Sequence, residues 1–92
     1  MRSDLTDALG IVIRRQRMEK GLSQEKLAEM SGVHTNYIGL IERGKRAATL
    51  EVIDRIASAL KVGLLELIRD VVEERRHDPS RPGSTRRHSA SR

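Results

Sequence analysis

The 92-residue sequence contains no cysteine, tryptophan or phenylalanine, and tyrosine occurs once. Without cysteine the chain forms no disulfide and offers no thiolate to a metal, and nothing in it indicates export. Its apolar runs are short, so no segment is predicted to span a membrane. The N-terminus lacks the long apolar stretch of a signal peptide. We therefore expect a cytoplasmic protein with an aliphatic core.

Positive charge is concentrated at the C-terminus. Residues 75–92, RRHDPSRPGSTRRHSASR, contain six Arg and one Asp and so account for the whole net charge of +5. This stretch is poor in apolar residues and rich in Arg, Ser and Pro, a composition typical of disorder. We predict a folded domain over 1–74 and a flexible Arg/Ser/Pro-rich tail over 75–92. Within the domain, cations gather in IRRQR and RGKR, whereas the last helical segment ends in acidic residues.

Five segments show apolar residues at helical spacing, and none alternates with the period of two that indicates a strand. The first three helices are expected over 4–20, 24–31 and 34–43. The fourth is expected from Leu50 to a stop before Gly63, and the fifth over 64–74. The apolar positions of the first helix are Leu5, Leu9, Val12 and Ile13. Five residues of the fourth helix are expected to face inward: Leu50, Ile53, Ile56, Ala57 and Leu60. The prediction is an all-α, compact five-helix bundle.

The second and third helices are joined by very few residues, which is the spacing of a helix-turn-helix. Helices joined so closely must cross steeply and touch, and Ala28 is small enough to allow that contact. Gly32 tolerates the positive φ that the reversal of the chain requires. Four apolar side chains are expected to fill the angle between the two helices: Leu27, Val33, Ile38 and Ile41.

The stretch SQEKLAEMSGVHTNYIGLIERGKR, followed by TLEVIDRIASALKV, resembles the lambdoid phage repressor and Cro class of helix-turn-helix domains. The resemblance extends over roughly residues 9–68. It implies five helices, with the helix over 34–43 as the recognition helix, and a two-fold dimer on a pseudo-palindromic operator. The short chain, the TNYI sequence and the apolar last helix further resemble controller proteins of restriction–modification systems.

The predicted recognition helix carries short, uncharged, hydrogen-bonding side chains opposite its two isoleucines. A merely solvated helix face normally carries Glu, Lys and Gln, so this composition favours contact with base edges. Asn36 fits the N6 and N7 edge of adenine, Thr35 fits a base or a thymine methyl group, and Leu40 fits a thymine methyl group. We expect these three residues to read double-stranded DNA in the major groove. Gly39, on the same face, permits either close approach to DNA or tight packing.

Residues around this face are expected to bind phosphates. Gln24 begins the second helix, where backbone N–H groups and the helix dipole favour an anion. The resemblance adds that Gln24 braces the side chain at the start of the recognition helix. His34 takes the N-cap position, where Ser, Thr or Asp is usual, and is expected to donate to a phosphate. Three cations are expected to clamp the DNA backbone, the alternative being a solvated basic loop: Arg43, Lys45 and Arg46.

Two further interpretations concern single side chains of the motif. Tyr37, the one aromatic residue, is predicted either to hydrogen-bond a phosphate or to pack partly into the core. The family resemblance pairs an Arg of the first helix with the Glu of IERG, and Arg17 and Glu42 match these positions. We expect a shielded ion pair that orients the recognition helix and reads no base.

The last helix is apolar over a wider arc than the stripe of roughly 100° that packing on one core needs. The surplus predicts a symmetric homodimer, which buries the same patch of each copy. The alternative is a helix wholly buried in its own domain. The residues expected in the dimer interface are Leu64, Leu67, Ile68, Val71 and Val72.

No nucleophile–base pair, glycine-rich phosphate loop or cluster of metal ligands is found in the sequence. Neither an enzyme nor a cofactor or metal site is therefore predicted. The serious rival to DNA binding is a protein-binding module of the same fold, as in an antitoxin or a co-activator. An Arg-rich tail lacks the apolar anchors that would neutralise a toxin, so we predict a sequence-specific transcriptional regulator.

Overall fold

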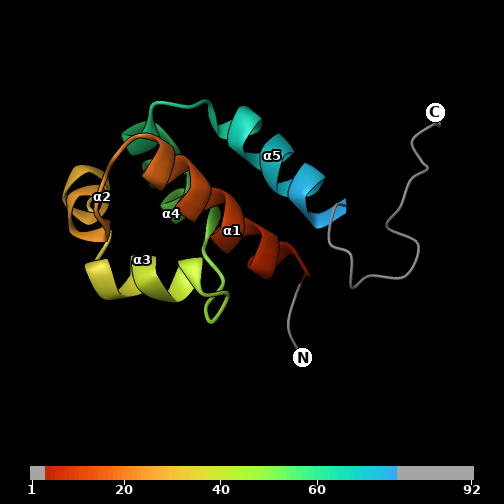
Figure 1. Ribbon diagram of the computed structural model, residues 1–92, viewed down its shortest axis with the longest axis horizontal. Helices are drawn as coiled ribbons and strands as arrows, with labels where there is room; N and C mark the ends of the chain where they lie inside the picture. The colour runs from red at the N-terminus through yellow and green to blue at the C-terminus, as the bar shows by residue number, and fades with distance from the viewer. Residues whose placement is uncertain (1–3, 77–92) are drawn as a thin grey trace.

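The computed structural model describes residues 4–76, and within that range it contains five α-helices and no strand (Figure 1). The helices are α1 (Asp4–Glu19), α2 (Gln24–Ser31), α3 (Thr35–Glu42), α4 (Leu50–Leu60) and α5 (Leu64–Arg76). The all-α prediction is confirmed. Helix α5 runs two residues beyond its predicted end, and the rest of the predicted tail lies outside the described residues.

Helix α1 lies at the centre of the bundle, with α5 running antiparallel along one side and α3 on another (Figure 1). Helix α2 packs on α3 and α4, and α4 also contacts α5. The core is aliphatic throughout, as the composition requires. Its fully buried side chains are Val12, Ile13, Leu27, Ile38, Ile41, Ile56, Leu60 and Leu67. Within residues 4–76, no helix is both long enough and apolar enough to cross a membrane.

Side-chain caps mark where two of the helices begin. Ser23 accepts a hydrogen bond from the backbone N–H of Lys26 and so starts α2, and Thr49 does the same for α4 through the N–H of Val52. Gly32 ends α2 with a φ of +72°, in the left-handed region where a Cβ is disfavoured. These local signals fix where the chain turns between α2 and α3.

A contact between α1 and α3 depends on Gly10, which sequence reasoning did not single out. A Cβ at Gly10 would lie 2.7 Å from the carbonyl oxygen of Glu42 and closer still to that of Ile41. The two helix backbones therefore touch at this point. Because only glycine permits so close an approach, Gly10 sets the position of α3 against α1.

The prediction that Leu50 faces inward is wrong, whereas the predicted dimer interface stays a prediction. Leu50 is 69% exposed and Leu5 44% exposed, because each lies near the start of its helix, before the helix enters the core. Leu67 and Val71 are 0% and 4% exposed, so within one copy of the chain they present almost no surface. The remaining predicted interface residues, Leu64, Ile68 and Val72, are half-buried.

Candidate nucleic-acid interface

Helices α2 and α3 form the predicted helix-turn-helix. Only Gly32, Val33 and His34 separate them, and Ala28 and Val33 are buried where the helices meet. Ile38 and Ile41 are completely buried beneath α3. One side of α3 is therefore committed to the core, and the opposite side faces outward along the lower edge of the molecule (Figure 1).

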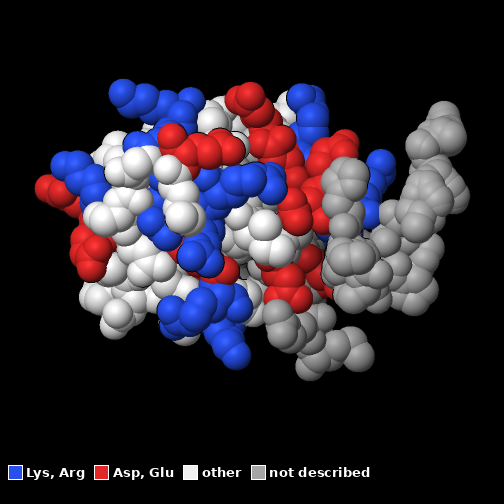
Figure 2. All heavy atoms as spheres, viewed as in Figure 1, with Lys and Arg blue, Asp and Glu red and all other residues white. Residues whose placement is uncertain are grey.

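The three predicted base-reading residues lie on that outward side. Asn36 is exposed, and Thr35 and Leu40 are half-buried at its margins. None of the three has its side chain inside the hydrophobic core. The start of α3 is mostly uncharged on the surface, whereas Lys and Arg atoms gather around the loop that follows it (Figure 2). Short polar side chains therefore lie in the middle of this surface, and cations lie at its edge.

His34 caps α3, although it is not a usual capping residue. Its Nδ1 accepts a hydrogen bond from the backbone N–H of Asn36, with 3.2 Å between the nitrogens. A neutral ring that accepts at Nδ1 carries its proton on Nε2. Capping of α3 and donation from Nε2 to a phosphate are therefore compatible in one protonation state.

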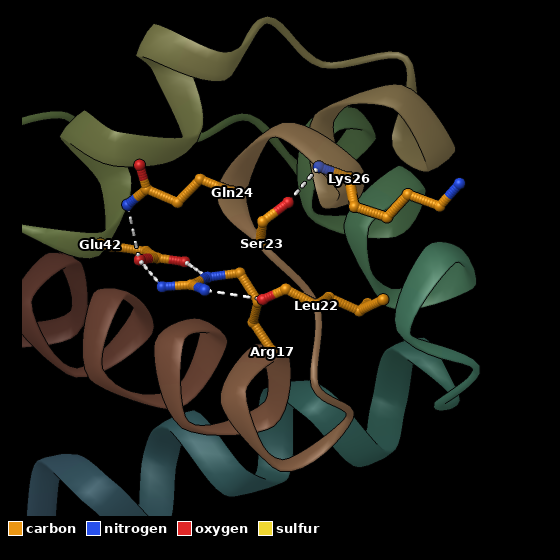
Figure 3. A network of polar contacts seen from close by, with 6 residues as sticks. All are labelled: Arg17, Leu22, Ser23, Gln24, Lys26 and Glu42. Carbon is orange, nitrogen blue, oxygen red and sulfur yellow. Dashed lines mark hydrogen bonds and ion pairs between the residues drawn. The ribbon is translucent and has the colours of Figure 1, made fainter.

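A buried carboxylate joins three helices behind this surface (Figure 3). Arg17 donates to Glu42 through Nε to Oε2 at 2.7 Å and through Nη2 to Oε1 at 3.0 Å, and its Nη1 donates to the carbonyl oxygen of Leu22 at 2.8 Å. The Glu42 side chain is only 2% exposed. The hydrogen bond from Arg17 to Glu42 raises the pKa of Arg17 above its ordinary value, against the opposing effect of burial. The predicted ion pair is confirmed.

Gln24 takes part in the same network, in a way that the family resemblance did not indicate. Its Nε2 donates to Oε1 of Glu42 at 3.0 Å, so it braces the end of α3 and not the side chain at its start (Figure 3). That bond also fixes which way the amide points, since the nitrogen must face Glu42. The carbonyl oxygen of Gln24 then lies towards α3, beside Gly39.

Gly39 is buried because two polar side chains cover it. A Cβ at Gly39 would lie 3.2 Å from Nη1 of Arg43 and 3.6 Å from Oε1 of Gln24. Arg43 therefore folds back along α3 and brings its guanidinium group beside Gln24. The sequence suggested separate positions for these two residues, whereas the structure brings them together at the α2–α3 junction. The side chains of Arg43 and Gln24 therefore pack over Gly39, and close approach of this position to DNA stays a prediction.

Tyr37 is half-buried, and its ring packs against the core. Its hydroxyl group donates to the carbonyl oxygen of Ala47 at 3.2 Å. The guanidinium carbon of Arg46 lies 5.2 Å from the centre of the ring, within cation–π range. Arg46 and Lys45 are otherwise exposed, in the loop of residues 43–49. Partial core packing, one of the two predicted roles, is therefore observed for Tyr37.

An apolar groove lies at the other end of the molecule, where α1 begins and α5 ends. It has a volume of about 310 Å³. Sequence reasoning missed it because its walls come from distant segments. It is lined by Leu5, Thr6, Leu9, Ala47, Ala48, Leu50, Ile53, Ile68, Val71, Val72 and Arg75. Among the described residues, no group of His or carboxylate side chains is placed to hold a metal ion.

Comparisons with known proteins agree with this geometry. The helix-turn-helix family model matches residues 13–67. Control protein C.SmaI of Serratia marcescens is 40% identical over 65 residues, which cover 71% of this chain and 77% of that protein. The restriction–modification controller protein C.AhdI from Aeromonas hydrophila has a TM-score of 0.65 and 42% identity, covering 67% of this chain and 94% of that one.

A third similar protein has been solved with DNA. The restriction–modification controller protein C.Esp1396I, a tetramer in complex with its natural 35-base-pair operator, has a TM-score of 0.75 and 32% identity. The match covers 80% of this chain and 97% of that one. With the buried isoleucines, the capped α2–α3 turn and the outward polar face, these matches identify the family. The chain belongs to the helix-turn-helix family of DNA-binding transcriptional regulators.

Proposed function

We propose that this protein binds a pseudo-palindromic operator as a homodimer and regulates transcription as a controller of a restriction–modification system. The observation that carries the proposal is the division of α3 into a fully buried apolar side and an outward side bearing Thr35, Asn36 and Leu40. The similarity to C.SmaI, C.AhdI and C.Esp1396I supports the controller assignment. Because its partner is operator DNA, we expect the protein to act in the cytoplasm.

In the proposed complex, α3 enters the major groove with its N-terminal half against the bases. Asn36 is the strongest candidate for a base contact because its side chain is exposed and can form two hydrogen bonds with adenine. Thr35 and Leu40 contact neighbouring bases from the margins of the helix. The buried network around Glu42 keeps α3 in place without using the residues that read the bases.

Phosphate contacts are proposed on both sides of α3. At one side, Gln24 at the start of α2 lies near the guanidinium group of Arg43, so the two are expected to bind the same stretch of backbone. His34 contributes an Nε2–H donor at the start of α3. At the other side, Lys45 and Arg46 extend from an exposed loop. Tyr37 is a less direct contact, because its hydroxyl group already donates to Ala47.

The homodimer is proposed to form through the apolar groove. Its rim includes the exposed Leu5 and Leu50 and the half-buried Ile68 and Val72, which together form an apolar surface at one end of the chain. The recognition helix begins at the opposite end, so a partner at the groove leaves it uncovered (Figure 1). A two-fold dimer then presents two α3 helices to half-sites about 34 Å apart on one face of DNA.

The test is selection of bound fragments from random and genomic DNA by the full chain, followed by footprinting. The expected result is one motif with two inverted half-sites whose centres are one helical turn apart. Equal retention of all duplexes would exclude sequence-specific binding. Recovery of a stoichiometric protein partner from cells, independent of DNA, would instead favour an antitoxin or co-activator.

A further inference from the structure

Tyr37 connects the recognition helix to the loop that follows it. The backbone N–H groups of Gly44 and Lys45 donate back to Ile41 and Leu40, so the start of the loop is held by α3 itself. Tyr37 reaches further along the loop, with its hydroxyl group on the carbonyl oxygen of Ala47 and its ring beneath the guanidinium group of Arg46.

The same loop belongs to two surfaces. Arg46 is on the side that is proposed to meet DNA, whereas Ala47 and Ala48 line the apolar groove together with Leu50. The residue whose carbonyl group Tyr37 holds is therefore itself a wall of the groove. A change in the conformation of residues 45–48 would alter both surfaces at once.

We infer that Tyr37 is a positioning residue that couples operator binding to self-association by holding Ala47 and Arg46 in one loop conformation. This inference rests on the proposed function, since it takes the groove as the interface between two copies. Tyr37 acts through the loop. The hydrogen bond from its hydroxyl group to Ala47 keeps Ala47 in place as part of the groove lining, and the same loop conformation directs Arg46 towards DNA. Coupling of this kind is reciprocal, so whatever stabilises the loop in one interaction favours the other.

The coupling role of Tyr37 predicts a result that a role in direct DNA contact does not predict. If Tyr37 served only to bind a phosphate, loss of its hydroxyl group would weaken DNA binding and leave the DNA-free dimer unaffected. If it holds Ala47, the same loss weakens the dimer in the absence of any DNA. Tyr37→Phe separates the two because it keeps the ring, its packing on the core and the stacking of Arg46.

The experiment measures the dimer dissociation constant of the full chain, free of DNA, by sedimentation equilibrium. Tyr37→Phe is compared with the unaltered protein, with Ser58→Ala as a matched loss of an exposed hydroxyl group on α4, and with Leu50→Asp at the rim of the groove. Thermal unfolding of each variant verifies that it is folded. Tyr37→Phe is expected to raise the dissociation constant about three- to tenfold, the effect of one lost hydrogen bond, and Ser58→Ala to leave it unchanged.

The outcomes separate this inference from the proposed function. If Leu50→Asp yields monomers and Tyr37→Phe associates as tightly as the unaltered protein, the coupling role is wrong and the groove remains the interface. If Leu50→Asp remains dimeric, the groove is not the interface and the inference fails with it. Specific DNA binding by α3 is tested independently of both results, by fragment selection.

Discussion

Gly10 lies against the carbonyl oxygen of Ile41, with no room for a side chain between α1 and α3. Gly39 within α3 is also covered, but the groups that cover it differ in kind. Backbone atoms, which cannot move alone, cover Gly10, whereas the flexible ends of Arg43 and Gln24 cover Gly39. The two glycines should therefore respond differently to the same substitution.

Gly10→Ala is expected to lower the free energy of unfolding by about 1–3 kcal/mol, because the added methyl group must push two helices apart. The better helix propensity of alanine offsets only part of this cost. Urea denaturation measures the change. Stability equal to that of the unaltered protein would show that α1 and α3 can separate freely.

Gly39→Ala is expected to lower operator affinity and not the stability of the fold. Alanine improves helix propensity by up to about 1 kcal/mol, and Arg43 can move away from the new methyl group. We expect unfolding stability to be kept or raised while operator affinity falls several-fold, because Arg43 and Gln24 lose their shared position. Fluorescence anisotropy with a labelled operator provides the second measurement. Unchanged affinity would remove Arg43 from the DNA contacts.

Asn36→Ala is expected to lose sequence preference at one base pair of each half-site, at a cost of about 1–3 kcal/mol per half-site. The side chain is exposed, so stability should be unaffected. Competition between operator and unrelated duplex gives the specificity ratio. Asp54→Ala, at an exposed position of α4 away from α3, is the control. A ratio that Asn36→Ala leaves intact would assign base reading elsewhere.

Lys45→Ala should weaken binding to every sequence about equally, because a phosphate contact carries no sequence information. The slope of log affinity against log salt concentration should become shallower by about one for each phosphate that the variant no longer neutralises. Titrations at several salt concentrations measure this slope. A slope identical to that of the unaltered protein would identify Lys45 as a solvated cation.

Glu42→Ala is expected to destabilise the fold by about 3 kcal/mol, because it leaves the guanidinium group of Arg17 with little solvent and no carboxylate. Replacing both partners, as Arg17→Met with Glu42→Leu, should recover much of this stability. Chemical denaturation of the single and double variants measures the difference. Additive effects in the double variant would argue against a direct interaction.

Most of the fold follows from local signals in the sequence. The helices, the caps Ser23 and Thr49, and the turn at Gly32 depend on neighbouring residues, so they could be predicted. The pair of Arg17 and Glu42 was found only through resemblance to a family, since no local pattern joins residues 25 positions apart.

Features set by the packing of distant segments could not be predicted. Gly10 looks like any helical glycine until the carbonyl groups of α3 are placed over it. Leu50 fits the apolar stripe of α4, yet it lies 69% exposed because the core begins a turn later. In α5, periodicity shows which residues are apolar but not how many of them α1 covers.

Three helices meet at the carboxylate of Glu42: α1 through Arg17, α2 through Gln24, and α3 through its own chain. These contacts hold α3, the proposed recognition helix, in one orientation, and the loss of a single contact leaves the others to maintain its tilt. A change in operator preference must then come from substitutions of the side chains on the outward side of α3. Residues 35, 36 and 40, the proposed base-reading positions, could then be exchanged between related regulators without changing the packing beneath α3.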